Sequence, residues 1–528
     1  MSKLPSLIAI LTAALAVYAQ TNVLTYHNDI ARTGQNLAET ILTTSNVNST
    51  IFGKLFLTKL DGRVDAQPLY ATSISVPGQG EHNLLIAATE NDSLYALDAD
   101  SGAVLWHTSL LKTGETPSDD RGCSQVTPEI GITSTPVIHL KSGPAAGVVY
   151  AVAMSKDSSG NYHQRLHALT LAAGAEAAAS PVDIQAKYPG TGDNSSGGYV
   201  IFDPAQYKAR SGLLLLDGTV YIGWSSHCDY RPYTGWLMGY NATSLAQSTV
   251  LNVTPNGEGG ALWAAGAGIA ADTSANIYYL IANGTFDTKL NSQGFPRKGD
   301  FGNAFVKIST GSGGLAVADY FTMFNTVSES DADQDLGAGG TLVLPRMKDS
   351  RGNVRDLAVG AGKDANIYLA DRNNMGKFNP SNNNNIYQVL TGSLAGSVFS
   401  SPAYYNGRVY FGAVNDSIRA FQFSKAVLSS RPQSLTSNQF GYPGATPSIS
   451  ANGTTNGIVW AIENSSPAVL HAYSADNLAR ELYNSNQAGG GRDHFGPGNK
   501  FMAPTIVNGK VYVSTPTGVA AFGLLGSR

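Results

Sequence analysis

The feature that most constrains the fold of this chain is a pattern of short β-strands that recurs eight times along it. In each repeat, a segment of small residues, often with proline, leads into a first strand, and a turn with Asn, Asp or Gly connects it to a second strand rich in Val and Tyr. Runs of β-branched and aromatic residues bounded by turn residues are typical of short strands. First strands are predicted at 67–70, 135–138, 211–214, 267–270, 339–342, 401–404, 446–449 and 503–506. Second strands are predicted at 84–87, 148–151, 220–223, 277–280, 357–360, 409–412, 458–461 and 511–514.

These repeats predict one all-β domain, an eight-bladed β-propeller of four-stranded blades. Repeat distances of roughly 45 to 75 residues suit four-stranded blades with loops of different length. A further strand is predicted at 53–60, and the last repeat ends after its third strand at 519–522. If the N-terminal strand completes the C-terminal blade, the ring closes without an open sheet edge. The Ala-rich stretch 171–180 is the only helix-like segment and is interpreted as an insertion.

The first 19 residues have the features of a secretory signal peptide. Lys3 provides positive charge, 7–17 is a short apolar run, and 17–19 resembles a cleavage site. We therefore expect a signal peptide at 1–19 and a single propeller domain at 20–528, in a secreted protein (periplasmic in a bacterium). No other stretch is long and apolar enough to cross a membrane.

The composition narrows the range of partners. Charged residues make up 14% of the chain and the net charge is −4, which leaves no electrostatic footprint for nucleic acid. We expect a monomer that binds a small molecule or a carbohydrate. Asn-x-Ser/Thr sequons, compatible with a secreted glycoprotein, occur at Asn48, Asn91, Asn194, Asn241, Asn252, Asn283, Asn415, Asn452 and Asn464.

The chain has two cysteines, Cys123 and Cys228, which the predicted fold places in neighbouring blades on one face. In an oxidising compartment they could form one disulfide. The alternative is two buried free thiols, because spacing alone does not determine pairing.

One segment carries a specific family resemblance. The run from Ala96 to Trp106 resembles the tryptophan-docking motif of pyrroloquinoline-quinone (PQQ) propeller proteins, Ala-x-Asp-x-x-Thr-Gly-x-x-x-Trp, with Ser101 in place of Thr. The chain from about Tyr26 to Leu525 is similar to exported PQQ-like-repeat proteins related to the quinoprotein alcohol dehydrogenases. The segments that carry this wider resemblance are 226–229, 283–287, 371–376 and 484–490.

The resemblance implies a propeller fold and oxidation by PQQ held with calcium. The chain departs from that pattern at two points. Dehydrogenases of this fold have an adjacent Cys-Cys pair beside the cofactor, whereas the two cysteines here are far apart in the sequence. The chain also lacks the C-x-x-C-H motif that would attach a haem.

Charged residues gather in loops that a propeller brings to one face. Because charged residues are scarce in the whole chain, this grouping indicates a site for acid–base chemistry or for a polar ligand. The alternative is a solvated rim of ion pairs between blades. Loops leading into first strands contain Arg63, Asp65, Lys208, Arg210, Glu258, Asp333, Asp335, Arg492, Asp493, His494 and Lys500. Loops between second and third strands contain Glu90, His227, Asp229, Asp287, Lys363 and Asp364.

Four of these residues are the catalytic candidates: His227, Asp229, Asp333 and Asp335. His227 and Asp229 could form a general-base pair beside an aromatic wall made by Tyr233 and Trp236. A purely structural loop cluster is the alternative.

The alternating carboxylates Asp331, Asp333 and Asp335 suggest oxygen ligands for calcium, with Asp333 and Asp335 as the predicted metal ligands. The EF-hand pattern is absent, and an exposed acidic turn is the alternative reading. The residues predicted to bind a cofactor such as PQQ are Arg210, Glu258, Trp263, Asn283, Lys363 and Asp364.

Three functions fit this sequence. The first is a PQQ-type oxidoreductase that acts on a polar small molecule in the central funnel. The second is a cofactor-free propeller enzyme, such as a hydrolase, lyase or isomerase. The third is a non-catalytic carbohydrate- or protein-binding propeller, which the fold alone never excludes.

Overall fold

A computed structural model describes residues 21–143 and 145–526, so the predicted signal peptide at 1–19 lies outside the described residues. Within these ranges the only α-helix is α1 (Thr326–Asp331), and the remaining helical turns are η1 (Ala264–Gly266), η2 (Leu336–Ala338) and η3 (Gly489–Gly491). None of the described helices has the length and apolar character needed to span a bilayer.

Eight sheets of four or more strands account for most of the described chain. The first sheet has β3 (Leu69–Val76), β4 (Gly80–Ala88), β5 (Ser93–Asp98) and β6 (Val104–Ser109). The second has β7 (Thr116–Asp119), β8 (Glu129–Ile130), β9 (Val137–Leu140), β10 (Gly147–Lys156), β11 (Tyr162–Thr170) and β12 (Val182–Asp183). The third has β16 (Tyr207–Ala209), β17 (Leu214–Leu216), β18 (Thr219–Ser226), β19 (Trp236–Asn241) and β20 (Gln247–Asn252). The fourth has β21 (Ala270–Ala271), β22 (Asn276–Leu280), β23 (Phe305–Ser309), β24 (Ala316–Thr322) and β30 (Lys377–Phe378).

The remaining sheets continue in chain order. The fifth has β25 (Leu342–Val343), β28 (Leu357–Ala361), β29 (Ile367–Asp371) and β31 (Gln388–Leu390). The sixth has β32 (Ala403–Tyr405), β33 (Arg408–Gly412), β34 (Ile418–Ser424), β35 (Val427–Leu428) and β36 (Ser434–Leu435). The seventh has β1 (Gln35–Asn36), β37 (Ser448–Asn452), β38 (Thr455–Glu463), β39 (Val469–Ser474) and β40 (Asn477–Asn484). The eighth has β2 (Phe52–Lys59), β41 (Thr505–Val507), β42 (Lys510–Thr515) and β43 (Gly518–Leu524). There are also two smaller sheets. One contains β13 (Lys187–Pro189), β14 (Ser195–Ser196) and β15 (Tyr199–Ile201), and the other contains β26 (Met347–Lys348) and β27 (Val354–Arg355).

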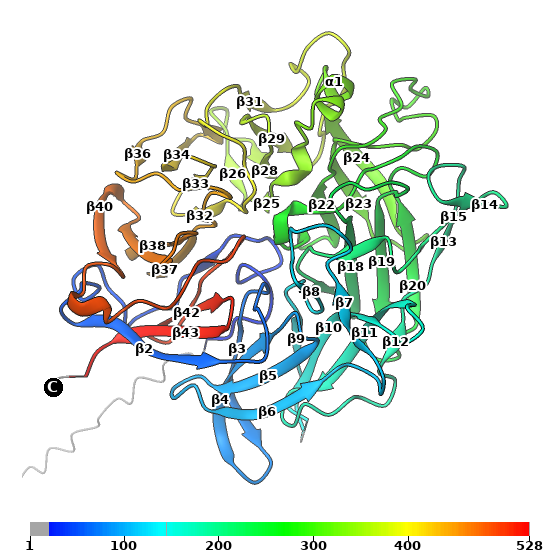
Figure 1. The fold of residues 1–528 in the computed structure, drawn as a ribbon. Coiled ribbons are helices and arrows are strands. Elements are labelled where there is room, and N and C mark those ends of the chain that lie inside the picture. The colour runs from blue at the N-terminus through cyan, green and yellow to red at the C-terminus, as the bar shows by residue number, and fades with distance from the viewer. Residues whose placement is uncertain (1–20, 144, 527–528) are drawn as a thin grey trace, which may run out of the picture.

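The predicted strand pairs are confirmed in all eight repeats. Each predicted first strand pairs antiparallel with its predicted second strand. The Ala-rich stretch 171–180 contains no helix. Figure 1 shows the large sheets following one another around the molecule in chain order, from the blue β3–β6 to the red β42 and β43.

The predicted pairing of the two chain ends is also present. Strand β2 pairs antiparallel with β43, with Phe52 opposite Leu524 and Lys59 opposite Gly518, and the two strands lie side by side in Figure 1. The eighth sheet therefore contains strands from both ends of the described chain.

The docking motif connects neighbouring sheets. Trp106 packs closely on Gly174, which follows β11 of the next sheet: a Cβ added to Gly174 would lie 2.5 Å from Cε3 of Trp106. Thr108 Oγ1 also donates a hydrogen bond to the Gly174 carbonyl (2.7 Å). Phe56 and Thr58 of β2 contact Gly102 of the first sheet in the same way, with a Thr58 Oγ1 to Gly102 carbonyl distance of 2.8 Å. The eighth sheet thus docks on the first as the first docks on the second.

The N-terminal segment, residues 23–36, contacts the first strand, or the residue just before it, in every one of the eight sheets. Its carbonyls accept backbone hydrogen bonds from Tyr70, Ile138, Ala271, Val343, Tyr404 and Ile449. Its side chains reach the other two sheets, because Arg32 donates to the Leu213 carbonyl (3.2 Å) and Asn36 donates to the Ile506 carbonyl (3.0 Å). A single short segment therefore contacts all eight sheets at or next to their first strands.

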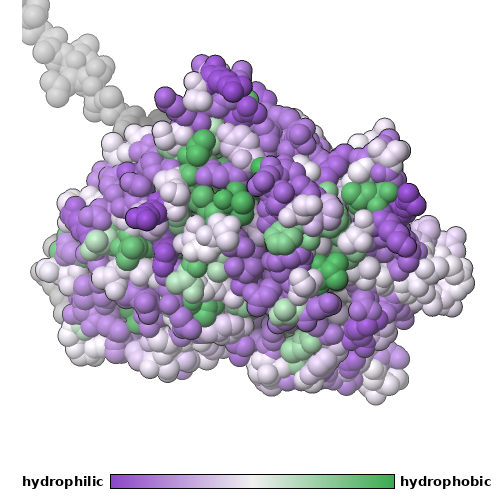
Figure 2. All heavy atoms as spheres, turned by 90° about the horizontal axis from the view of Figure 1, so that it is seen from above, coloured by the Kyte–Doolittle hydropathy of each residue, from purple (hydrophilic) through white to green (hydrophobic). Residues whose placement is uncertain are grey.

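The surface seen from above in Figure 2 is mainly hydrophilic, and its hydrophobic residues form small groups separated by polar ones.

Candidate functional site

A cavity of about 500 Å³ lies where loops leading into first strands meet loops between second and third strands. We call it the main cavity. Six of the predicted site residues line it: Asp229, Trp263, Asn283, Asp333, Asp335 and Lys363. A second cavity of about 470 Å³, the side cavity, shares Asp229, Asn283 and Asp333 with the first and also includes Glu258. The two kinds of loop thus meet on one face, as the repeat pattern predicts.

Lys363 holds the carboxylates of Asp333 and Asp335. Its Nζ lies 2.5 Å from Asp333 Oδ1 and 2.7 Å from Asp335 Oδ1, and Asn283 Nδ2 donates to the same Asp333 oxygen (2.7 Å). Asp335 is 2% exposed. Burial raises the pKa of its carboxyl to about 6, with Asp333 and Asp229 adding to the effect and Lys363 opposing it. At neutral pH Asp335 is therefore an ionised base with a pKa close to the working range.

This arrangement bears directly on the predicted calcium ligands. Among the residues that the structure describes, no group of three or more His, Cys, Asp or Glu side chains is arranged to hold a metal ion. Asp333 and Asp335 instead share an ammonium group, and Lys363 offsets one of their two negative charges. As arranged, this donor set does not fit calcium, which takes six to eight oxygen ligands.

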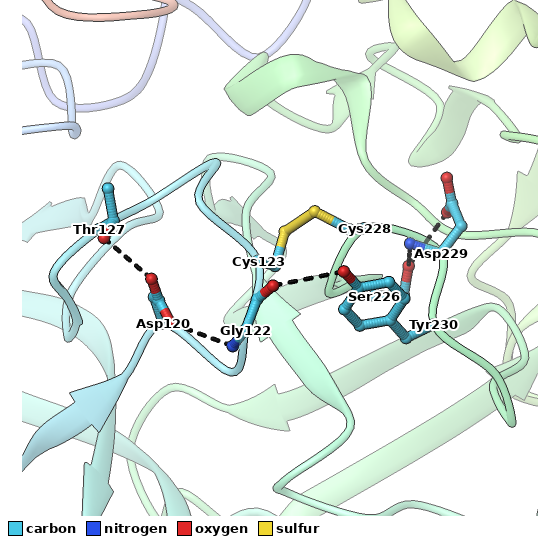
Figure 3. Close-up of a disulfide and its surroundings, with 8 residues drawn as sticks. All are labelled: Asp120, Gly122, Cys123, Thr127, Ser226, Cys228, Asp229 and Tyr230. Atoms are coloured by element: carbon cyan, nitrogen blue, oxygen red, sulfur yellow. Dashed lines mark hydrogen bonds between the residues drawn. A yellow bond between two sulfur atoms is a disulfide. The ribbon is translucent and has the colours of Figure 1, made fainter.

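Cys123 and Cys228 form a disulfide with a Cα–Cα distance of 5.6 Å. Figure 3 shows the bond joining the loop after β7 to the loop after β18, with Asp229 next to Cys228. Cys228 and Asp229 both line the main cavity. The disulfide therefore lies in the wall of the cavity although its cysteines are far apart in sequence.

His227 and Asp229 do not form the predicted pair. Asp229 Oδ1 instead accepts hydrogen bonds from Ser226 Oγ (3.1 Å) and the Tyr233 hydroxyl (2.8 Å). His227 is 2% exposed and lines neither cavity. Burial lowers the pKa of its imidazole to about 3, and Lys208 acts in the same direction. The imidazole is consequently neutral at neutral pH.

Three other predicted residues, Asp364, Glu258 and Arg210, do not line the main cavity. Asp364 accepts hydrogen bonds from the Tyr368 hydroxyl (2.6 Å) and Asn366 Nδ2 (2.9 Å) and lines neither cavity. Glu258 forms an ion pair with Arg231 in the side cavity.

Four aromatic side chains form a closed cluster, and three of them, Trp263, Phe399 and Tyr442, line the main cavity. Ring centroids are 5.8 Å apart for Trp263 and Phe399, 5.6 Å for Phe399 and Tyr442, 6.5 Å for Tyr442 and Phe501, and 6.1 Å for Phe501 and Trp263. We call these four residues the aromatic cluster. Sequence reasoning identified only Trp263. The missed signal was positional, because each ring lies two to four residues before a predicted first strand.

Three cations lie over the faces of these rings. Lys363 Nζ is 5.9 Å from the ring centroid of Trp263, the Arg210 guanidinium is 5.0 Å from that of Phe501, and Lys500 Nζ is 5.8 Å from that of Tyr442. Lys363 and Arg210 were both predicted to bind a cofactor. Aromatic faces with cations beside them can accommodate a flat, negatively charged ligand.

A second carboxyl pair, Glu90 and Asp65, is buried on the same face. Glu90 is 1% exposed, and its Oε2 accepts hydrogen bonds from the Gly131 amide and Thr133 Oγ1 (both 2.8 Å). Burial, together with Asp65, raises the pKa of Glu90 to about 8. Glu90 is therefore mostly protonated at neutral pH.

Comparisons with known proteins identify the fold. No family model and no curated protein sequence matches the chain. The chain is similar to the solved structures of a quinohemoprotein alcohol dehydrogenase from Comamonas testosteroni (TM-score 0.64, 13% identity, 97% of this chain and 82% of that one) and of another from Pseudomonas putida (TM-score 0.63, 14% identity, 96% and 81%). A europium-containing methanol dehydrogenase is also similar (TM-score 0.61, 12% identity, 96% and 98%). At these identities the likeness shows a propeller-like fold of the kind found in PQQ-type dehydrogenases.

Proposed function

We propose that this chain is a quinoprotein-like oxidoreductase that binds a flat, anionic quinone of the PQQ class in the main cavity and oxidises a polar small molecule such as an alcohol or sugar. The aromatic cluster and its three cations carry this proposal. PQQ is a planar polycarboxylate, so its ring would pack on Trp263 and a carboxylate would meet Lys363, both of which line the cavity. Arg210 and Lys500, over the rings of Phe501 and Tyr442 in the same cluster, add positive charge beside it. The volume of the main cavity lies in the range usual for cofactor sites.

A bound quinone of this class supplies the acceptor for the electrons of the substrate. The chain supplies the groups around the reacting hydroxyl. Asp335 is the proton acceptor, because it is ionised at neutral pH and buried beside the cavity. Lys363 orients Asp335 and stabilises negative charge that develops on a nearby oxygen. This proposal does not include calcium, because Lys363 already occupies the oxygens of Asp333 and Asp335 that would bind it.

The test is a titration of metal-stripped protein with PQQ, with and without calcium, followed by absorbance and by dye reduction across alcohols and sugars. Saturable binding with one PQQ per chain and dye turnover is the expected result. Trp263→Leu removes one ring face and should weaken PQQ binding about 10-fold. Tyr230→Leu is the matched control, since this ring is exposed and does not line the main cavity. Folded protein that binds no PQQ under either condition would refute the proposal.

A cofactor-free enzyme is the second candidate, and the Lys363 ion pair with Asp333 and Asp335 favours it. The buried carboxylate of Asp335, with its raised pKa, and the ammonium of Lys363 beside it could act as a general base and a general acid without any cofactor. Hydrolysis, elimination or isomerisation that persists in PQQ-free protein and is lost in Asp335→Asn would support this candidate. Ligand binding that survives Asp335→Asn, with no turnover of any substrate, would instead indicate a non-catalytic carbohydrate- or protein-binding propeller.

We also propose that the eight large sheets are the blades of one closed propeller. The strand pairs, the N-terminal segment and the contacts of β2 with both β43 and Gly102 support this arrangement. Deleting residues 21–60 should then expose sheet edges and cause aggregation, whereas an open arrangement would leave the remaining sheets soluble.

Export of the chain as a monomer is a further part of the proposal. The disulfide supports export, because such bonds persist in oxidising compartments. N-terminal sequencing of the mature protein tests the predicted cleavage after Ala19. We expect glycosylation at only some of the sequons. Asn252 should remain unmodified, since its side chain is buried and donates a hydrogen bond to Thr234 Oγ1 (2.7 Å).

A further inference from the structure

Lys208 is a buried amine that reaches the main cavity without an ion pair. Its side chain lines the cavity although the residue is only 4% exposed. In the described part of the chain, its Nζ takes part in no hydrogen bond or salt bridge, in contrast to Lys363 in the same cavity. The backbone of Lys208 is fixed in β16, opposite Ser225, whose Oγ donates to the Lys208 carbonyl (3.1 Å). A rigid strand therefore holds an unpaired amine at the cavity wall.

The surroundings of Lys208 favour its neutral form. Burial lowers the pKa of the ammonium to about 8, and Arg210 and Lys500 act in the same direction, whereas Glu90 and Asp65 oppose them. The other charged or titratable groups near it are the neutral imidazole of His227 and the residues that line the same cavity, Asp229, Asp333, Asp335, Lys363 and Tyr442. At pH 7 about one amine in ten is neutral, roughly 200-fold more than for a solvent-exposed lysine.

We propose that Lys208 is a carbonyl-reactive amine, and that the main cavity binds an aldehyde or ketone that forms an imine with its Nζ. The lone pair of the neutral amine adds to the carbonyl carbon, so that a C–N bond forms, the C–O π bond breaks, and one proton passes from the nitrogen to the oxygen. The nitrogen then loses its second proton as the C–O bond breaks and the oxygen leaves as water, which gives the imine without any oxidant or reductant. Asp229, Asp333 and Asp335 line the same cavity and are the carboxyl groups available to move the protons.

The cavity also defines the kind of carbonyl compound. Three rings of the aromatic cluster and Lys363 line the cavity, and Arg210 and Lys500 lie over rings of the same cluster, so the site favours a flat compound that carries an anionic group. This inference does not depend on quinone binding, since the imine forms on the chain itself.

Pyridoxal 5′-phosphate, a flat aromatic aldehyde with an anionic phosphate, is a suitable probe. The quinone-free protein is treated with the probe, the imine is trapped with borohydride, and the modified lysines are mapped by mass spectrometry. Lys208 should be labelled at least about 10-fold faster at pH 7 than the exposed Lys425, and its rate should rise through pH 8 and then level off. Labelling of Lys208 no faster than that of Lys425 would overturn the proposal.

Two variants separate reaction at Lys208 from general labelling of the chain. Lys208→Arg keeps the charge but cannot form an imine, so the fast phase should disappear. Lys425→Arg removes an exposed amine outside the cavity and should leave the fast phase in place. A fast phase that survives Lys208→Arg, or that maps to Lys363, refutes the assignment. The mapping on wild-type protein decides the question even if Lys208→Arg does not fold.

Discussion

The guanidinium of Arg32 joins the N-terminal segment to the third and fourth sheets, and its removal should destabilise the fold strongly. Arg32 is 0% exposed. Its Nε donates to the Ile269 carbonyl (2.8 Å), Nη1 donates to Thr25 Oγ1 (2.6 Å) and the Tyr26 carbonyl (2.7 Å), and Nη2 donates to the Leu213 carbonyl (3.2 Å). Burial lowers the pKa of the guanidinium to about 10, so it remains charged at neutral pH.

Arg32→Met keeps most of the side-chain volume and removes every donor. Three buried carbonyls then lose a charged partner, and each unsatisfied group costs about 1–3 kcal/mol. Relief from burying a charge offsets part of this cost. The net loss in the free energy of unfolding should be about 3–5 kcal/mol, which lowers the folded-to-unfolded ratio more than 100-fold.

Urea unfolding followed by tryptophan fluorescence measures this loss as a shift of the midpoint. Arg346→Met is the matched control, because the Arg346 side chain is 78% exposed and its ion pair with Asp356 is at the surface. The control should leave the midpoint unchanged. If Arg32→Met unfolds at the same urea concentration as the control, the N-terminal segment does not hold the sheets together through this residue.

Three further predictions concern the disulfide, Glu90 and Asp335. Cys123→Ser with Cys228→Ser opens a disulfide spanning 105 residues, a loop whose closure contributes up to about 4.7 kcal/mol; the urea midpoint should fall, and reducing agent should shift the wild type but not the variant. The folded-state pKa of Glu90 is about 8, above the ordinary 4.5, so the folded chain binds more protons between these values and its stability falls as pH rises from 5 to 8; Glu90→Gln should flatten that slope in unfolding experiments, and an unchanged slope would contradict the raised pKa. If Asp335 is the base, Asp335→Asn should lower turnover by about 10²–10⁴-fold and wild-type turnover should fall as pH drops through 6; equal turnover at pH 5 and pH 7 would exclude this role.

The strand framework could be predicted from the sequence because its signals are local. Runs such as 148–151 and 511–514 combine β-branched and aromatic residues between turn residues, and no competing helical pattern exists. The pairing of 53–60 with 519–522 could be predicted because the strand at 53–60 belongs to no repeat and the last repeat has no fourth strand of its own. The N-terminal segment 23–36 gave no such signal, because its hydrogen bonds are to the inner edges of distant strands. Its Arg32 looks like a surface residue, since arginines are seldom fully buried.

The site could be predicted only as a group of loops. Because charged residues are scarce in the chain, the loops that contain them could be assigned to one site, and Asp229, Asp333, Asp335 and Lys363 do line one cavity. The contacts between these side chains could not be predicted. Adjacent residues in a chain often point in different directions, so Asp364 faces Tyr368 although it follows Lys363 directly. Positive φ angles at Cys228 (50°) and Asp229 (55°) turn the chain between His227 and Asp229, and no short-range pattern indicated this.

The ion pair formed by Lys363 distinguishes a quinone site with calcium from one without it. Calcium would need the carboxylates of Asp333 and Asp335, which already lie 2.5 and 2.7 Å from Lys363 Nζ. Calcium and Lys363 therefore compete for the same oxygens, and a bound calcium would leave a buried ammonium without partners. The three cations at the aromatic cluster, in contrast, need no metal to attract an anionic ring. Quinone binding at this site should accordingly be independent of calcium, even though sequence resemblance alone implied a calcium-held cofactor.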